Sequence, residues 1–449
     1  GGNFAATVTT GNMTDSGALA ITGTTTLTTN ANNATIALDT TTNAFTGAVT
    51  ITTNDNSGTD ADVTIDGGTT ALILAASTID GDLTVRSGNA SGITDSGTLT
   101  VGGNLAATTD ANNGLINLGT LAVDGTVQLT TNGTGNATVV NDAGLDFAAS
   151  TVGGNFAATA TTGNMTDSGA LTIAGTSSFT TSANNATIAL DTTTNAFTGA
   201  VTITTNDNSG TDADVTIDGG TTALILAAST IDGDLTVRSG NASGITDSGT
   251  VTVGGNLAAT TDANNGLINL GTLAVDGTVA LTTNGTGNAT VVNDAGLNLA
   301  ASTVGGNFAA TVTTGNMTDS GALTITGAAT FRTSESGSDI ALDSSGNAFS
   351  NAVTLEADTG NEVFGNITFV DSAAVKLNSS ASADGDLYIN ASTDGAVGGN
   401  LNITATTDNI TQGIALAITG TSSFTTSANN ETIALDTTTN AFTGAVTIT

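Results

Sequence analysis

Acidic side chains gather in one polar stretch, NDNSGTDADVTIDGG, which occupies residues 54–68 and returns at residues 206–220. Its carboxylates could converge with loop carbonyl oxygens on Ca²⁺, a hard cation that takes about six to eight oxygen ligands. A solvated polar loop is the alternative, because the spacing fits neither the EF-hand loop nor the nonapeptide repeat of calcium-binding β-helices. Ca²⁺ is the one cofactor suggested, and none is required. The candidate ligands are Asp55, Asp60, Asp62, Asp207, Asp212 and Asp214.

Residue types used in most catalysis are missing from the sequence. The 449 residues include no His and no Cys, so imidazole bases and thiolate nucleophiles are absent. Asp80 and Asp82 resemble a glycosidase pair, but they flank a turn glycine and recur in each full repeat, whereas an enzyme needs one cleft. Gly102-Gly103-Asn104 lacks the lysine and the helix of a phosphate loop, so a backbone corner explains it better. We therefore expect a protein that is not an enzyme.

The charge balance limits the partners. The formal net charge is −35, with only four Lys and Arg residues. Such a chain is unsuited to nucleic acid or to an anionic membrane surface, and it favours divalent cations or mutual repulsion between neighbouring molecules. No apolar run reaches the roughly 18 residues of a membrane span, so we expect no membrane insertion. The absence of cysteine is compatible with export through an oxidising compartment, and we expect an extracellular or cell-surface location.

Tandem repetition dominates the sequence. The phrase GGNFAAT begins at Gly1 and returns at Gly153 and Gly305, an offset of 152 residues each time. The sequence predicts repeat units at 1–152 and 153–304, a shortened unit at 305–397, and the start of a further unit at 398–449. We expect one continuous structure that is a fragment of a longer chain.

A shorter period lies inside each unit. Glycines 21 to 34 residues apart mark about six coils of roughly 25 residues, a typical solenoid period. Apolar residues alternate with threonine, as in Leu83-Thr-Val85, which is the pattern of a strand with one buried face. The absence of proline fits strands that are paired on both sides.

These features predict an all-β fold, a right-handed parallel β-helix (β-solenoid) of about 18 coils with almost no helix. A barrel or a sandwich closes on itself and would not tolerate the loss of 59 residues from the third unit, whereas an additive stack of coils would.

The phrases VGGNLAATT, DGDLTV and TSSFTTSANNATIALDTTTNAFTGAVTIT resemble the repeat regions of very large secreted bacterial proteins. These are the filamentous-haemagglutinin-like adhesins and related β-strand-repeat surface proteins, and the resemblance extends over the whole chain. It implies a right-handed parallel β-helix, export to the cell surface, and a role in attachment or matrix building.

Near-identical repeats without a differentiated site favour a non-catalytic structural protein that forms an extracellular fibre or a cell-surface stalk. One alternative is an adhesin for attachment between cells or to surfaces, with its recognition tip elsewhere. Another is a subunit of a sheath or surface layer. The expected partner is the protein itself, associated end to end or laterally. Surface glycans or other cells would be partners of an adhesin.

Overall fold

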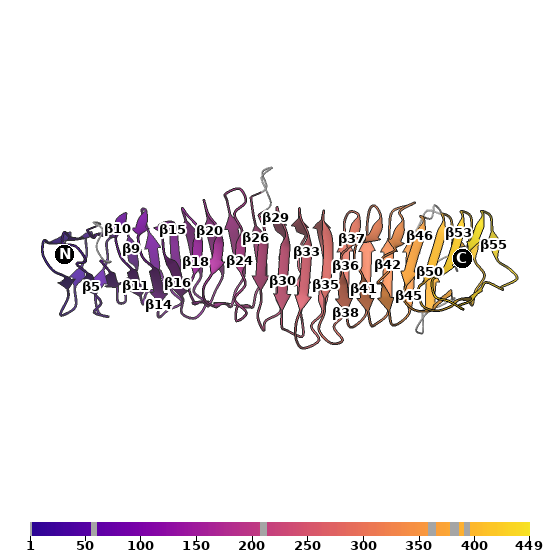
Figure 1. Cartoon of the computed structure of the whole chain (residues 1–449). Coiled ribbons are helices and arrows are strands. Elements are labelled where there is room, and N and C mark those ends of the chain that lie inside the picture. Colours follow the sequence, from indigo (N-terminus) through magenta and orange to yellow (C-terminus); the bar gives the residue numbers. More distant parts are fainter. Residues whose placement is uncertain (1, 55–60, 207–212, 358–364, 378–385, 390–395) are drawn as a thin grey trace. The chain divides into compact units, whose positions relative to one another are not determined.

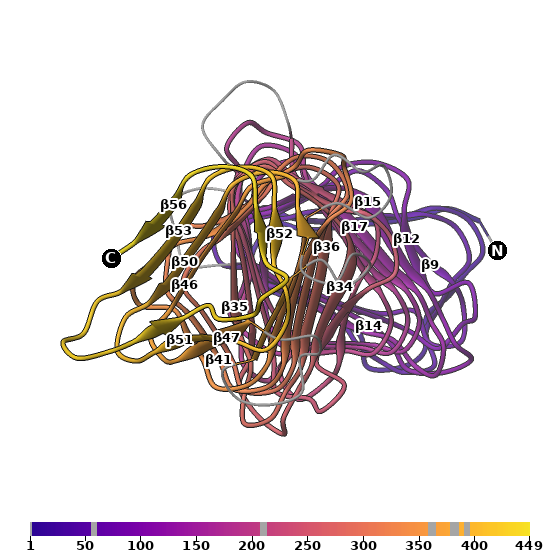
Figure 2. The same ribbon diagram turned by 90° about the vertical axis from the view of Figure 1, so that its right-hand side faces the viewer.

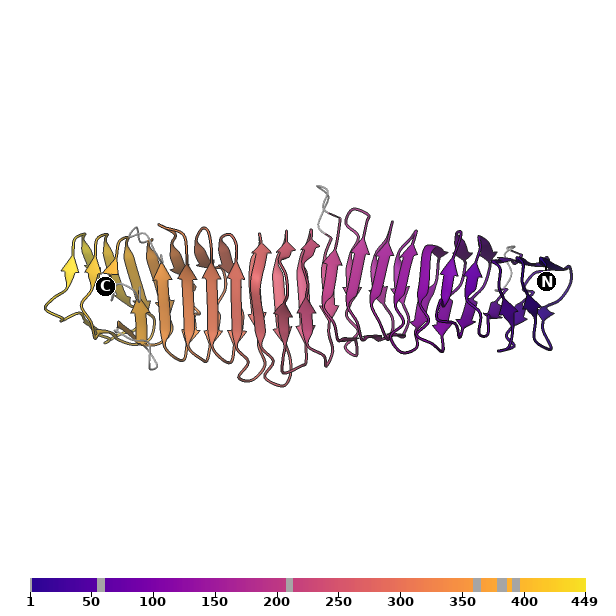
Figure 3. The ribbon, with the colours of Figure 1, turned by 180° about the vertical axis from the view of Figure 1, so that it is seen from behind.

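The computed structural model describes residues 2–54, 61–206, 213–357, 365–377, 386–389 and 396–449. These residues form strands and turns without any helix, and so no helix that could cross a membrane occurs among them. The chain divides into two compact units, residues 1–222 and 223–449. In each unit the strands stack one behind the next (Figures 1 and 3).

Unit 1 alternates between single long strands, mostly of four or five residues, and pairs of short strands. The long strands are β1 (Phe4–Val8), β4 (Thr25–Thr29), β7 (Val49–Thr52), β8 (Val63–Asp66), β11 (Leu83–Ser87), β14 (Leu105–Thr109), β16 (Thr126–Thr130), β17 (Ala137–Asn141), β20 (Phe156–Ala160), β23 (Ser177–Thr181), β26 (Val201–Thr204) and β27 (Val215–Asp218). The short strands are β2 (Met13–Thr14), β3 (Ala20–Ile21), β5 (Ile36–Leu38), β6 (Ala44–Phe45), β9 (Leu72–Leu74), β10 (Ser77–Ile79), β12 (Ile93–Asp95), β13 (Leu99–Val101), β18 (Leu145–Phe147), β19 (Ser150–Val152), β21 (Met165–Asp167), β22 (Leu171–Ile173), β24 (Ile188–Leu190) and β25 (Ala196–Phe197), and β15 (Ile116–Val123) merges one pair.

Unit 2 is built in the same way, except that three of the described strands, instead of a pair, lie between residues 371 and 401. Its long strands are β30 (Leu235–Ser239), β33 (Leu257–Thr261), β35 (Thr278–Thr282), β36 (Ala289–Asn293), β39 (Phe308–Val312), β42 (Ala329–Thr333), β45 (Val353–Ala357), β46 (Ile367–Asp371), β50 (Leu401–Ala405), β53 (Ser422–Thr426) and β56 (Val446–Ile448). The strands between them are β28 (Leu224–Leu226), β29 (Ser229–Ile231), β31 (Ile245–Asp247), β32 (Val251–Val253), β34 (Ile268–Val275), β37 (Leu297–Leu299), β38 (Ser302–Val304), β40 (Met317–Asp319), β41 (Leu323–Ile325), β43 (Ile340–Leu342), β44 (Ala348–Phe349), β47 (Val375–Leu377), β48 (Asp386–Ile389), β49 (Ala396–Val397), β51 (Ile410–Gln412), β52 (Ala417–Ile418), β54 (Ile433–Ala434) and β55 (Ala441–Phe442).

Most strands pair in parallel with the equivalent strand one turn further along the chain; one exception is β48, which pairs with both β45 and the earlier strand β47. Phe4 lies beside Thr25, and Thr25 lies beside Val49, so the turns are 21 and 24 residues long. The pairs form two main sheets in each unit. We call the sheet with β1, β4 and β7 sheet A, and the sheet with β5, β8 and β11 sheet B. In unit 2, β36, β39 and β42 belong to sheet A, and β43 and β46 belong to sheet B. The predicted parallel β-solenoid is confirmed.

The alternating sequence explains which side chains form the core. In β11 the side chains of Leu83, Val85 and Ser87 are buried, whereas Thr84 between them faces outward. In unit 1, Phe147, Phe156, Phe179 and Phe197 form an interior column of edge-to-face rings with centroids 5.3 to 5.8 Å apart. Such ring pairs contribute about 0.5–1.5 kcal/mol each beyond the burial of their surface.

Glycine is required where one backbone corner lies directly on the next. A Cβ atom on Gly47 would lie 2.4 Å from the carbonyl oxygen of Gly23, and one on Gly125 would lie 2.5 Å from that of Gly103. Both distances are far below van der Waals contact, so any larger residue would push the turns apart. The glycines that mark the coils in the sequence are therefore stacked corners.

The long strands change sheet within each 152-residue unit. They lie in sheet A through β7, in sheet B from β8 to β16, and in sheet A again from β17. Each change occurs where, among the residues that the structure describes, two long strands follow one another without a short pair between them, and it adds half a turn. Seven successive strand pairings in sheet B, each one turn apart, connect Val63 to its counterpart Val215. The intermediate positions are Leu83, Leu105, Val127, Leu145-Asp146-Phe147, Met165 and Ile188.

The expected six coils in each full unit are therefore wrong, and there are seven turns. The glycine spacings of 34 and 29 residues each contain one and a half turns, because the long strands change from one sheet to the other within them. We call such a position a side change. The expected total of about 18 coils compares with about 19 turns in the structure.

We predict that Ser177→Ala leaves the free energy of unfolding unchanged or raises it by up to about 1 kcal/mol. Among the described residues, no hydrogen-bond partner reaches the buried hydroxyl of Ser177, and Ala329 holds the equivalent position 152 residues later. Ser150→Ala is the control. The hydroxyl of Ser150 accepts the N–H of Leu129 at 3.0 Å and donates to the carbonyl of Ala148 at 2.8 Å. Its loss should cost about 1–3 kcal/mol in denaturant titrations. Equal destabilisation by both changes would contradict the prediction.

Candidate carboxylate sites on the solenoid

A column of Asp and Asn side chains runs along one corner of unit 1, one residue before successive long strands. The carboxylate of Asp62 accepts the backbone N–H of Asp82 at 2.9 Å, and that of Asp82 accepts the N–H of Asn104 at 2.7 Å. The side-chain oxygen of Asn104 then accepts the N–H of Thr126 at 2.8 Å. Each oxygen satisfies a backbone donor of the next turn, where the corner interrupts the strand ladder.

Most of the predicted calcium ligands lie outside the described residues. These are Asp55, Asp60, Asp207 and Asp212. Asp62 and Asp214 are described, and both are exposed at the residues that precede β8 and β27. The described residues contain no group of three or more acidic side chains that could hold a metal ion. The calcium site thus remains a prediction, and the structure brings Asp62 together with the corner column.

Asp80 and Asp82, the pair considered for glycoside hydrolysis, are parts of a corner. The carboxylate of Asp82 accepts both the backbone N–H and the side-chain amide of Asn104, the latter at 3.1 Å. The backbone N–H of Asp80 donates to the hydroxyl of Thr53 at 2.8 Å. A carboxylate held by two donors of the neighbouring turn is positioned to stabilise the stack.

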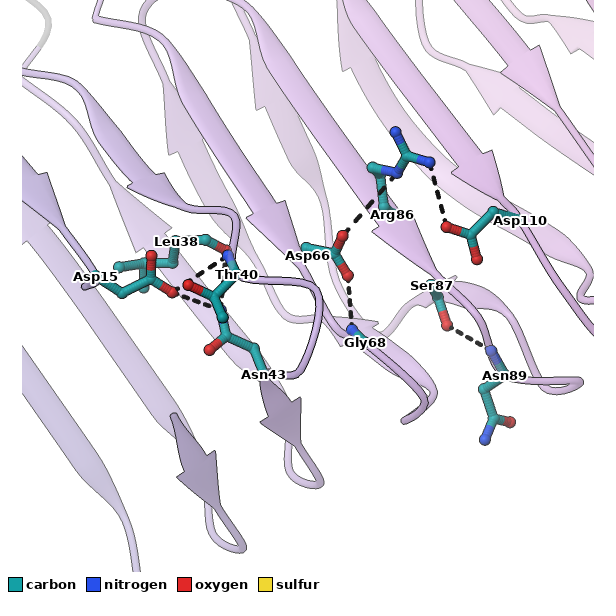
Figure 4. Close-up of polar contacts among 10 residues, drawn as sticks. All are labelled: Asp15, Leu38, Thr40, Asn43, Asp66, Gly68, Arg86, Ser87, Asn89 and Asp110. Atoms are coloured by element: carbon teal, nitrogen blue, oxygen red, sulfur yellow. Dashed lines mark hydrogen bonds and ion pairs between the residues drawn. The ribbon is translucent and has the colours of Figure 1, made fainter. Parts of the chain in front are cut away.

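A second arrangement, which the sequence reasoning missed, joins a carboxylate to a buried asparagine one turn away (Figure 4). The side-chain amide of Asn43 donates to Asp15 at 2.7 Å and to the carbonyl of Leu38 at 3.2 Å. Its oxygen accepts the backbone N–H of Leu19 at 2.7 Å. Asn43 is 1% exposed, so these bonds satisfy a polar group inside the fold. We call this pair the Asp–Asn clasp.

The clasp recurs wherever the sequence TDSGAL recurs with its partner NAF. Asp167 accepts from Asn195 at 2.6 Å, and Asp319 accepts from Asn347 at 2.7 Å. In the last copy Gln412 replaces the aspartate. Its side-chain N–H donates to the oxygen of Asn440, and its side-chain oxygen accepts the amide N–H of Asn440. The fixed spacing of 28 residues between the two partners was the sequence signal that could have revealed the clasp.

Burial perturbs the charge of one clasp. Desolvation raises the pKa of Asp167 above its ordinary value of 3.8, and the donors from Asn195, Thr192 and Asp191 only partly offset this effect. A carboxyl group whose pKa is raised by folding favours the folded state when it is protonated. Asp167 therefore adds stability at low pH that is lost as the pH rises through its pKa.

A third arrangement uses one of the few cations. The guanidinium of Arg86 lies 3.2 Å from the carboxylate of Asp110 and 4.0 Å from that of Asp66 (Figure 4). Asp110 and Arg86 are largely exposed, whereas Asp66 is 5% exposed and also accepts the N–H of Gly68 at 2.7 Å. Gly68 has a positive φ of 56°, so this bond holds a tight turn.

Taken together, the fold and these carboxylates define a class: a parallel β-solenoid of tandem repeats whose described acidic contacts largely connect one turn to the next. A family described as repeats of unknown function (DUF5649) matches residues 1–52, 60–119, 134–204, 212–270, 286–356 and 364–449, and the chain belongs to this family. Comparison with curated proteins and with solved structures found no similar protein in either set.

The family repeat coincides with the side changes of the long strands. The matches from the second onward begin just before β8, β17, β27, β36 and β46, the second strand of each consecutive long pair. From β17 to β26 a repeat contains four long strands with three short pairs between them, which is three and a half turns. The 152-residue period of the sequence is therefore two family repeats.

We predict that Asp167→Gln removes one component of the pH dependence of stability. Gln412 shows that an amide fits the clasp position. The free energy of unfolding of the wild type, minus that of the variant, should fall as the pH rises from 3.8 through the raised pKa of Asp167, and should be constant above it. Denaturant titrations at several pH values measure this difference. A difference that increases with pH would contradict the sign of the pKa shift.

We also predict unequal effects at the two partners of Arg86. Asp110→Asn should change the free energy of unfolding by less than about 1 kcal/mol, because the pair is largely exposed. Asp66→Ala should cost about 1–3 kcal/mol, because the N–H of Gly68 loses its acceptor in a buried turn. Thermal or denaturant unfolding of both variants compares the two losses. An equal or larger loss for Asp110→Asn would show that the exposed ion pair dominates.

Proposed function

We propose that this chain is a non-catalytic structural protein that forms an extracellular fibre or a cell-surface stalk. The observation that carries the proposal is the use of its carboxylates. In the corner column and in the clasps, the acidic oxygens accept donors of the adjacent turn, as with Asp82 and Asp167. Side chains engaged in this way hold turns together, and a stack held together at every turn is suited to bear load along its length.

The alternation of the long strands also supports a structural role. A binding or catalytic face needs the same side chains on one side of the solenoid. Here the long strands occupy sheet A in one repeat and sheet B in the next, as β7 and β11 illustrate. A support or spacer has no need of a constant face.

The proposed location outside the cell rests on composition and on the resemblance to filamentous-haemagglutinin-like surface proteins. The chain lacks cysteine and carries a net charge of −35, which keeps neighbouring molecules apart and soluble. The finer identity, an adhesin of that group, is part of the same proposal. In that case the recognition of glycans or of other cells would belong to another part of the protein.

We predict that antibodies raised against this chain label filaments or stalks on intact, unpermeabilised cells of its source in immunogold electron microscopy. The control is an antibody against a cytosolic protein, which should label only permeabilised cells. A continuous labelled coat would replace the stalk by a sheath or surface layer. Labelling confined to permeabilised cells would overturn the proposed location and role.

A further inference from the structure

Strands with equivalent sequences lie in different sheets of unit 2. β39 (FAATV) and β50 (LNITA) both follow the phrase GGN. β39 pairs with β36 and β42 in sheet A, whereas β50 pairs with β46 and β53 in sheet B. Figure 2 shows β46, β50, β53 and β56 side by side. In unit 1 the equivalent strands β1 and β20 both belong to sheet A. Local sequence therefore does not determine which sheet a strand joins.

The number of side changes accounts for the difference. Two changes separate β1 from β20, at β7/β8 and at β16/β17. One change separates β39 from β50, at β45/β46. The sequence NITFVD at residues 366–371, which contains β46, corresponds to NATVVN at residues 136–141, which contains β17. The third repeat unit of the sequence, residues 305–397, thus passes from the equivalent of β7 directly to the equivalent of β17. One family repeat, the counterpart of β8 to β16, is missing from it.

We propose that each repeat of this chain shifts the chain that follows it by half a turn, and we call such a repeat a half-turn phase element. The gain or loss of one repeat changes the solenoid by three and a half turns, about 17 Å at about 4.8 Å per turn, and moves the residues that follow to the opposite sheet. The gain or loss of two repeats restores the original sheet. The hydrogen-bonded ladder is continuous in both cases, because at a change of sheet a long strand pairs with both strands of a short pair, as β16 pairs with β18 and β19.

This inference goes beyond the proposed support role, because it sets where any outward side chain of a repeat is presented. A step of one repeat moves an equivalent residue to the opposite sheet, and a step of two repeats returns it to the same sheet. A partner that contacts the solenoid from one side therefore meets equivalent residues only in every second repeat. Thr330 on β42 and Ser423 on β53 are equivalent residues of two neighbouring repeats. Because only one repeat step separates them, they lie on opposite sheets.

Cysteine pairs test the phase in the full chain, which has no cysteine of its own. Ser423 lies three rungs from Ala341 in one column of sheet B, through Thr368 and Asn402. Thr330 lies in sheet A, half a turn before Ala341. We expect spin labels in Ala341→Cys/Ser423→Cys to be about 14 Å apart at the backbone. Labels in Thr330→Cys/Ser423→Cys should be clearly farther apart, by the extra half turn and the roughly 10 Å between sheets.

A restored repeat provides the second variant. Replacing residues 358–364 by a copy of residues 54–134 inserts the missing repeat and should return β53 to sheet A. A label at the Ser423 position should then lie three rungs, about 14 Å, from a label at the inserted copy of Asn117 in sheet A, as Ser178 lies from Asn117 through Ala157 and Thr138. A label at the inserted copy of Ala106, in sheet B, should be farther away. The reverse order of these two distances would overturn the proposal. If the insertion does not fold, the unmodified order decides: a Ser423 label nearer to Thr330 than to Ala341 in the original chain would also overturn it.

Discussion

The structure depends on one constraint: equivalent positions of successive parallel turns lie about 4.8 Å apart and are joined by backbone hydrogen bonds. Every position is therefore a column, and each residue must be compatible with its equivalents above and below. Two like charges at that spacing repel by roughly 0.9 kcal/mol in water, which disfavours columns of Lys or Glu. Threonine columns such as Thr28, Thr52, Thr78 and Thr100 avoid this cost.

The same constraint explains where charges are accepted. The carboxylates of Asp62 and Asp82 follow one another in a corner column, but each accepts a backbone N–H of the next turn. Hydrogen bonds from N–H groups stabilise the ionised form and offset the repulsion within the column. All three arginines lie near an acid 24 residues away, about one turn along, as Arg332 does beside Glu356 at 3.5 Å. These charged side chains are thus each placed beside a group of the neighbouring turn that stabilises their charge.

The fold class was predictable because periodicity reports directly on burial. Leu83-Thr-Val85 and similar runs predict inward and outward positions correctly. The turn count was not, because glycine spacing alone does not distinguish one turn from one and a half. The long strands β16 and β17 follow one another with only a tight turn at residues 131–136, and nothing in their composition marks the change of sheet. The clasps were missed because their partners are 28 residues apart and meet only after a full turn.

The odd number of half-turns explains why the long strands change sheet from one repeat to the next. A repeat with an even number would end with a short pair and be followed by a long strand in the same sheet, which is the succession already found within each repeat. Here the junction joins two long strands, as β16 joins β17. The ladder continues across it because the long strand β16 pairs with the two short strands β18 and β19 of the next turn. The cost is the loss of a constant face, which a protein with one binding surface could not accept and a support could.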